Sequence, residues 1–245
     1  MTSVCISMRS MRVNRLSSRS YPRWLLAQSV GGGALLVSLA AVATDDVVSV
    51  ALITLWCGVA FGRLVTLGGG LHGPADLVTT VRLAAAVAWL LFINPGAASA
   101  GLLALILALD LVDGWLARRF GPTPQGAIYD MEADQLTVLI LAYHAVSQGL
   151  PVWVLVMPGL KYVSVLLSSF LGLPFADPKP KDGDNRRGRL VCAFTFVALW
   201  SVSLPGVSSS AKTALVAAAL GLLLLSFSDD LRFLLHKEAR APELT

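Results

Sequence analysis

Long apolar stretches separated by short polar breaks run along most of the chain. A helix that spans a bilayer needs about 20 predominantly apolar residues. Eight stretches approach that length, at 25–43, 47–67, 77–94, 98–116, 126–147, 152–172, 190–206 and 211–228. The breaks contain turn-forming residues, such as Asn-Pro-Gly at 94–96. The pattern predicts an all-α polytopic transmembrane helix bundle. The Gly-Gly-Gly run at 31–33 makes its first two spans the weakest part of the prediction, because glycine is a poor helix former.

Composition and charge support this reading and suggest an orientation. Charged residues make up 14% of the 245 positions, whereas soluble domains carry about 25%. If the N-terminus is cytoplasmic, all but Lys161 and Lys212 of the 19 basic residues lie on the cytoplasmic side, as the positive-inside rule requires. We therefore expect an integral protein of a prokaryotic plasma membrane with both termini in the cytoplasm. Residues 1–24 would form a basic cytoplasmic arm and residues 236–245 a cytoplasmic tail.

Several kinds of chemistry are disfavoured by the sequence. The three cysteines lack metal-ligand spacing and show no disulfide framework. The three histidines are scattered, so neither a zinc site nor a nucleophilic triad is indicated. Nucleic acid is not an expected partner.

The segment "LALDLVDGWLARRFGPTPQGAIYDMEADQLTVLI" at 107–140 places many charges in an apolar region. Asp110 and Asp113 are three residues apart near the end of one predicted span, and Asp130 and Asp134 are four apart at the start of the next. Residues at these separations share a helix face. Two adjacent antiparallel helices would therefore present two carboxylate pairs at one membrane depth.

Such a cluster needs compensation, because a carboxylate at the membrane centre costs about 2.5–3.5 kcal/mol. Four carboxylates can hold one or two divalent cations, and all-oxygen ligands favour Mg²⁺, Mn²⁺ or Ca²⁺. Paired metal ions commonly act on phosphate groups. Gly114, Ala117 and Gly126 would let a ligand approach the helices closely. Arg118 is placed for a bidentate phosphate contact.

Two other interpretations of the aspartates explain less of the pattern. Helix capping suits Asp130, which lies near a helix start, but it does not explain Asp110. The main alternative is a cation or proton-coupled transporter whose carboxylates bind the transported ion. A transporter would be expected to show charges near the bilayer midplane and paired broken helices in two halves, whereas here the carboxylates gather at one end of their spans.

The same residues resemble the signature of the CDP-alcohol phosphatidyltransferases. That signature reads Asp, two residues, Asp-Gly, two residues, Ala-Arg, eight residues, Gly, three residues, Asp, three residues, Asp. It is met here by Asp110, Asp113, Gly114, Ala117, Arg118, Gly126, Asp130 and Asp134. One departure is the connection 119–125, which has seven residues where the family usually has eight.

The stretch 73–92 is similar to the family's opening span, with Thr79 and Arg82 matching and Asp76 in place of the usual asparagine. The resemblance covers about residues 73–235, which implies a catalytic core of six helices. Residues 25–67 would then be two extra N-terminal transmembrane helices.

The resemblance implies a transferase of phospholipid biosynthesis. Family members move a substituted phosphate from a CDP-linked donor to an acceptor alcohol and release CMP. By this analogy Asp110, Asp113, Asp130 and Asp134 hold Mg²⁺ or Mn²⁺ in a two-metal site, and Asp134 is also the general base. Gly114, Ala117, Arg118 and Gly126 would border the CDP moiety. CDP-diacylglycerol is the expected donor, and the site would open at the cytoplasmic end of the bundle among membrane lipids. Family members are often homodimers, so a homodimer is compatible with the resemblance.

Lys161 is a basic residue in the middle of a predicted span. It follows Pro158 and Gly159, which can open a helix locally. A lysine within the membrane usually faces the bundle interior and has a partner. We therefore expect Lys161 either to border the acceptor pocket or to pair with a metal-site carboxylate.

Overall fold

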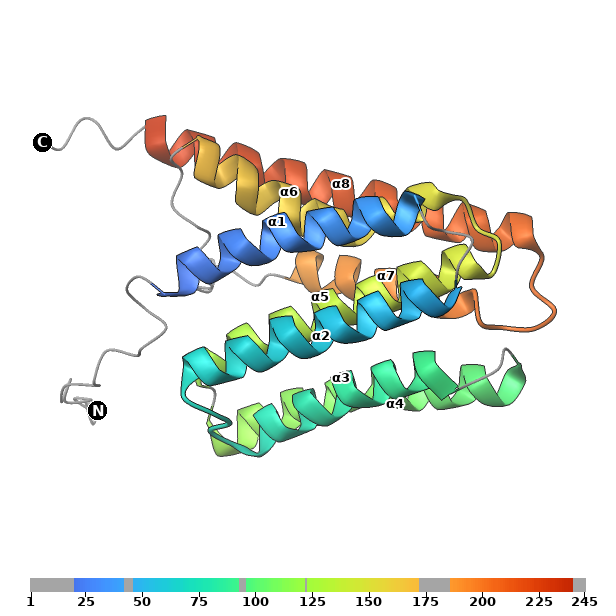
Figure 1. The fold of residues 1–245 in the computed structure, drawn as a ribbon. Helices are drawn as coiled ribbons and strands as arrows, with labels where there is room; N and C mark the ends of the chain where they lie inside the picture. The colour runs from blue at the N-terminus through green and yellow to red at the C-terminus, as the bar shows by residue number, and fades with distance from the viewer. Residues whose placement is uncertain (1–19, 42–45, 93–95, 122, 172–185, 240–245) are drawn as a thin grey trace, which may run out of the picture.

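The computed structural model describes residues 20–41, 46–92, 96–121, 123–171 and 186–239. The helices are α1 (Ser20–Ala41), α2 (Asp46–Gly68), α3 (Pro74–Phe92), α4 (Ala97–Phe120), α5 (Pro124–Ser147), α6 (Val156–Phe170), α7 (Arg186–Ser201) and α8 (Ser209–Ala239), with a 3₁₀ turn, η1 (Val152–Leu155), before α6. They form one bundle (Figure 1). No strand occurs within these ranges, and the all-α prediction is confirmed.

Six segments are long and apolar enough to cross a membrane: 21–41, 46–68, 74–92, 97–120, 152–170 and 209–229. They belong to α1, α2, α3, α4, η1 with α6, and α8, and they confirm a polytopic bundle. The other two predicted spans, 126–147 and 190–206, are not among these six. The apolar part of α7 covers only Leu190–Ser201. α5 has 24 residues, but Asp130, Glu132 and Asp134 interrupt its apolar character.

α5 tolerates these charges because it lies inside the bundle rather than against lipid. It packs on α2, α3, α6 and α7. Its segment Leu139–Ala142 has no exposed surface at all, so every face of the helix is covered there. Around it, α3 packs along α4, α1 along α6 and α7 along α8.

The glycine run in α1 does not interrupt the helix, which is continuous from Ser20 to Ala41. A Cβ added to Gly31 would lie 2.4 Å from Cη2 of Trp56 in α2, and one added to Gly32 would lie 2.3 Å from Cζ of Tyr162 in α6. Small residues allow helices in membranes to approach closely. Two of the three glycines therefore act as packing positions, which offsets their low helix propensity.

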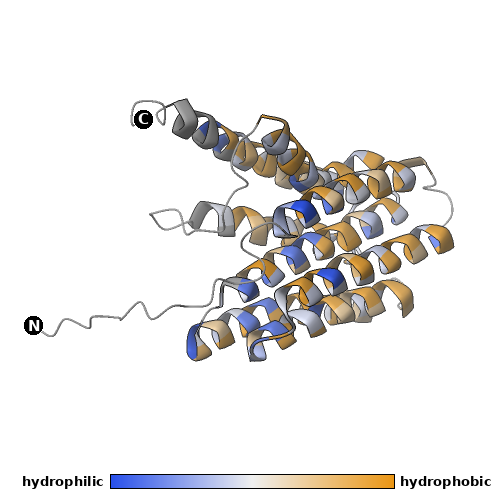
Figure 2. Ribbon diagram, turned by 60° about the vertical axis from the view of Figure 1, so that its left-hand side comes forward, coloured by the Kyte–Doolittle hydropathy of each residue, from blue (hydrophilic) through white to orange (hydrophobic). Residues whose placement is uncertain are grey.

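The polar connections and basic residues gather at one end of the bundle. The α2–α3 and α4–α5 connections lie at the end where α1 begins and α8 finishes, on the left of Figure 1, and hydrophilic residues are concentrated toward this end in Figure 2. Described basic residues near this end are Arg23, Arg63, Arg118, Arg119 and Arg232. Lys212, at the other end, donates to the carbonyl oxygen of Val202 at 2.7 Å. The arm before residue 20 and most of the basic segment 179–189 lie outside the described residues.

Candidate active site

The four aspartates come from two antiparallel helices joined by a short connection. Asp110 and Asp113 lie in the last three turns of α4, and Asp130 and Asp134 lie in the first three turns of α5. Gly121, with a φ of 95°, follows the last residue of α4. The Thr123 hydroxyl then accepts a hydrogen bond from the Gly126 amide at 2.9 Å, which is an N-cap contact. This local chemistry starts α5 at once and brings the two carboxylate pairs to one depth.

Arg82 of α3 lies at the centre of the aspartates. Its side chain is only 2% exposed. Nη1 pairs with Oδ1 of Asp110, while Nη2 lies 2.8 Å from Oδ1 of Asp134 and 3.0 Å from Oδ1 of Asp130. Oδ2 of Asp113 is farther from Nη2, at 3.9 Å. One guanidinium thus faces four carboxylates, and the site keeps an excess of negative charge.

Sequence reasoning gave Arg82 no role, although the necessary signal was present. Asp76, Thr79 and Arg82 recur every three residues and therefore share one face of α3. All three are buried. Polar residues along one face of an otherwise apolar helix indicate that this face contacts another polar group.

Three of the aspartates form the geometry expected of a cation site. Asp110, Asp130 and Asp134 each offer one carboxylate oxygen, and these oxygens lie within 4.8 Å of one another. Oδ1 of Asp134 is buried, and its partner within the described part of the chain is Nη2 of Arg82 at 2.8 Å. Three converging carboxylate oxygens are hard ligands that fit Mg²⁺ or Mn²⁺. The role of these residues as metal ligands stays a prediction.

Asp113 lies apart from these three. Its Oδ2 accepts a hydrogen bond from the Thr79 hydroxyl at 3.1 Å, and its side chain is buried. Asp113 also lines the neighbouring pocket, as does Asp130. The four aspartates are therefore not equivalent, and Asp113 links the carboxylate cluster to the pocket.

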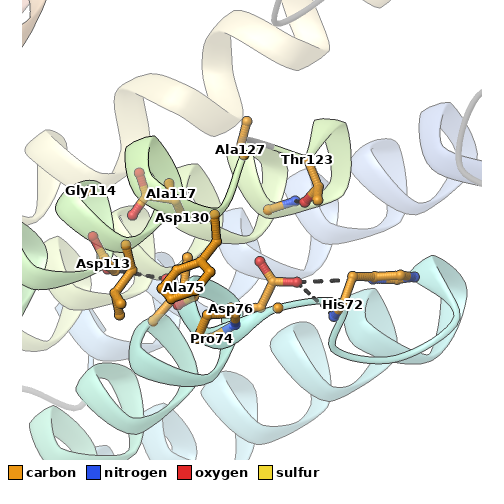
Figure 3. Close-up of a pocket in the computed structure, with 16 residues that line it drawn as sticks. His72, Pro74, Ala75, Asp76, Asp113, Gly114, Ala117, Thr123, Ala127 and Asp130 are labelled. Atoms are coloured by element: carbon orange, nitrogen blue, oxygen red, sulfur yellow. Dashed lines mark hydrogen bonds and ion pairs between the residues drawn. The ribbon is translucent and has the colours of Figure 1, made fainter.

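A pocket of about 290 Å³ lies between α3, α4 and the start of α5, near the lower end of typical ligand pockets at about 300 Å³. Three of the predicted CDP-binding residues, Gly114, Ala117 and Gly126, line it. Figure 3 shows Asp113 and Gly114 on one side of the view and His72 on the other, with Asp76 between them. Arg118 is exposed and does not line the pocket, but a Cβ added to Gly114 would lie 3.5 Å from its Nη1.

Gly126 has a structural reason to be glycine besides ligand access. A Cβ at this position would lie 2.6 Å from Oδ1 of Asp76 and 2.8 Å from Oγ1 of Thr123. The Asp76 carboxylate is fixed in turn, because its Oδ2 accepts a hydrogen bond from the His72 amide at 2.9 Å. The absent side chain lets the start of α5 lie directly against α3.

Lys161 lies on α6, and its partner is not one of the four aspartates. It forms an ion pair with Glu132 of α5, a residue that sequence reasoning overlooked. The expectation of a partner among the metal-site carboxylates was wrong, because Glu132 faces α6 whereas its neighbours Asp130 and Asp134 face Arg82 of α3. An acceptor-binding role for Lys161 stays a prediction.

Comparison with known proteins identifies the family. The model of the CDP-alcohol phosphatidyltransferase family matches residues 74–238, which is more than half of the chain, and the chain therefore belongs to this family. Membership implies transfer of a phosphatidyl group from a CDP-alcohol to an acceptor. No curated protein matches the chain, and no solved structure does. The helices α1 and α2 lie outside the matched region.

Proposed function

We propose that this protein transfers a phosphatidyl group from CDP-diacylglycerol to the hydroxyl of an acceptor alcohol and releases CMP. The observation that carries the proposal is the convergence of the carboxylates from α4 and α5 around Arg82, directly beside a pocket lined by small residues. The family signature that these residues match supports the same reading.

In the proposed reaction the acceptor oxygen attacks the phosphorus that carries the diacylglycerol group. A new phosphorus–oxygen bond forms as the bond to the CMP oxygen breaks, and CMP leaves with that electron pair. We assign the acceptor's proton to Asp134, whose Oδ1 lies in the carboxylate cluster, 2.8 Å from Nη2 of Arg82. A base must lie within hydrogen-bond reach of the proton that it removes, and the position of Asp134 at the carboxylate cluster supports this assignment.

The family is typically dependent on divalent metal, and the donor set here fits such an ion. Asp110, Asp130 and Asp134 would hold it, with Asp113 as the fourth carboxylate beside the pocket. When bound, Mg²⁺ or Mn²⁺ neutralises the charge that develops on phosphate oxygens. Gly114, Ala117 and Gly126 would leave room for the CDP moiety, and Arg118 would reach its phosphates from the rim.

The position of the site suits a donor that is part lipid. The site lies toward the end of the bundle where α1 begins, and the described arginines gather at the same end. We place this end at the cytoplasmic face by the positive-inside rule. The acyl chains of the donor would stay among membrane lipids while its nucleotide enters the pocket, and the arginines would attract its negative charge.

The test is CMP release from CDP-diacylglycerol by the purified full-length protein, with Mg²⁺ or Mn²⁺ and a panel of acceptor alcohols. The variant Asp134→Asn removes the proposed base with little change of shape, and we expect turnover to fall by about 10²–10⁴-fold. Asp229→Asn is the matched control, because it makes the same change at an exposed carboxylate of α8 far along the chain.

Metal-dependent CMP release that requires one acceptor and is lost only in Asp134→Asn supports the proposal. Absence of release with every acceptor contradicts it for this donor, and other CDP-alcohols should then be tried. Uptake of Mn²⁺ into vesicles that contain the protein, without CMP release, would instead favour the transporter interpretation.

A further inference from the structure

α5 carries acidic side chains on two opposite faces. Asp130 and Asp134 face Arg82 of α3. Glu132 is two residues from each of them, which corresponds to about 200° around a helix with 3.6 residues per turn. It points toward α1 and α6 and is only 1% exposed. A buried carboxylate therefore lies on the far side of the same two turns that hold the proposed metal ligands.

Two other helices bind this carboxylate. Oε2 of Glu132 accepts a hydrogen bond from Nε2 of Gln28 in α1 at 3.0 Å, and Oε1 pairs with Nζ of Lys161 in α6. Gln28 is 4% exposed. We call Gln28, Glu132 and Lys161 the Glu132 cluster. One buried carboxylate thus joins α1, α5 and α6.

Close packing surrounds the Glu132 cluster and fixes α1 against α6. Gly32 of α1 lies against the ring of Tyr162, the residue that follows Lys161, and a Cβ added to Gly159 would lie 3.3 Å from Cδ1 of Leu36. α1 lies outside residues 74–238, the region that matches the family. α1 is therefore additional to the family core, and it supplies Gln28, which donates a hydrogen bond to Glu132. Lys161 of α6 neutralises the charge of Glu132.

The cluster constrains the rotation of α5 about its own axis. Turning α5 would move Glu132 away from Lys161 and Gln28, and a buried charge that loses its partner is strongly destabilising. The same rotation would carry Asp130 and Asp134 away from Arg82 and Asp110. Buried polar residues are known to fix the register of helices in bundles. The direction in which the proposed metal ligands point therefore depends on the contacts of Glu132.

We propose that Gln28, Glu132 and Lys161 are positioning residues for the aspartate site, and that α1 is consequently part of the catalytic unit. They act through α5 and touch no reacting atom. The turnover part of this inference rests on the proposed function, whereas its effect on cation binding does not.

The experiment uses the full-length protein in lipid nanodiscs. Three properties are measured: the Mn²⁺ affinity by electron paramagnetic resonance, the thermal midpoint of unfolding, and kcat and KM for CMP release. Gln28→Leu and Lys161→Met each remove one partner of Glu132. Lys161→Arg keeps the charge, and Val30→Leu alters an exposed position of α1 as the control.

Loss of a group that orients a metal ligand typically lowers affinity or activity by about 10–100-fold. We expect Gln28→Leu and Lys161→Met to weaken Mn²⁺ binding about tenfold and to lower kcat by a similar factor. The KM for the donor should change less than kcat, because most residues that line the pocket belong to α3, α4 and their connections rather than to α5. Lys161→Arg should recover most of both losses, and Val30→Leu should behave as wild type.

The inference is overturned if Gln28→Leu and Lys161→Met lower the thermal midpoint while Mn²⁺ affinity and kcat stay at wild-type values, since the cluster would then only stabilise the fold. Failure of the proposed function looks different. In that case wild-type protein would release no CMP, while Mn²⁺ binding would still weaken in Gln28→Leu and would support the positioning role.

Discussion

Arg82 offers the sharpest test of how the aspartate site is held together without metal. Replacing it by methionine keeps most of the side-chain length and removes the positive charge. Asp110, Asp130 and Asp134 would lose their contacts with the guanidinium, the latter two at 3.0 and 2.8 Å. The metal-free variant should be clearly less stable than the wild type, because its carboxylates then repel one another without a cation between them.

The size of the loss follows from burial. Removing one partner from a buried ion pair costs about 3–5 kcal/mol. The side chains of Asp110 and Asp130 are each 46% exposed, so water screens part of their charge, and we expect a loss of about 3 kcal/mol, at the lower end of this range. At about 2–4 °C per kcal/mol for a chain of this size, the thermal midpoint should fall by about 6–12 °C.

The assay is thermal unfolding of the purified protein in EDTA and again in saturating Mn²⁺. Because Mn²⁺ restores positive charge at the carboxylates, it should raise the midpoint of Arg82→Met more than that of the wild type. Arg82→Lys keeps the charge but cannot fork between carboxylates, so its loss should be intermediate. Arg119→Met is the matched control, since Arg119 is exposed and stacks over Trp115 at 5.4 Å from the ring centroid.

The reasoning is refuted if Arg82→Met unfolds in EDTA at the same temperature as the wild type. The carboxylates would then not depend on the guanidinium for compensation. An equal drop in Arg119→Met would also contradict it, because the effect would then follow from loss of any arginine.

Three further predictions concern the pocket and the ion. Gly126→Ala should lower kcat/KM for CMP release about tenfold, because the new methyl group would lie 2.6 Å from Asp76 and displace α5. Gly101→Ala is the control and should have wild-type kinetics, because nothing lies within 4 Å of a Cβ at that position. Thr79→Val removes the hydrogen bond to Asp113 and should reduce Mn²⁺ affinity about tenfold in a binding titration, while unchanged affinity would show that this bond is unimportant. Treatment with EDTA should abolish CMP release and Mn²⁺ should restore it; activity that persists after chelation would exclude a metal-dependent reaction.

The sequence by itself determined the class of fold, and it indicated the chemistry that we propose. Long apolar stretches predict helices whose surfaces must be covered by lipid or by protein. This prediction depends only on the local composition of the chain. The aspartate pairs at 110 and 113 and at 130 and 134 could also be predicted, because helical periodicity fixes which residues share a face. The short connection between the two helices then required their carboxylates to meet. For the same reason, three of the four residues predicted to border the nucleotide do line the pocket.

Only the tertiary structure decided which charges compensate one another. Arg82 is separated by 48 residues from Asp130, and Gln28 by 104 residues from Glu132, so no local pattern links either pair. In the structure, Glu132 faces away from Asp130 and Asp134, its neighbours in sequence, and pairs with Lys161. Periodicity gives the relative directions of side chains around one helix, but the neighbouring helix on each face is set by the packing of the whole bundle. Because of that packing, Lys161 of α6, Arg82 of α3 and Gln28 of α1 contact acidic side chains of α5.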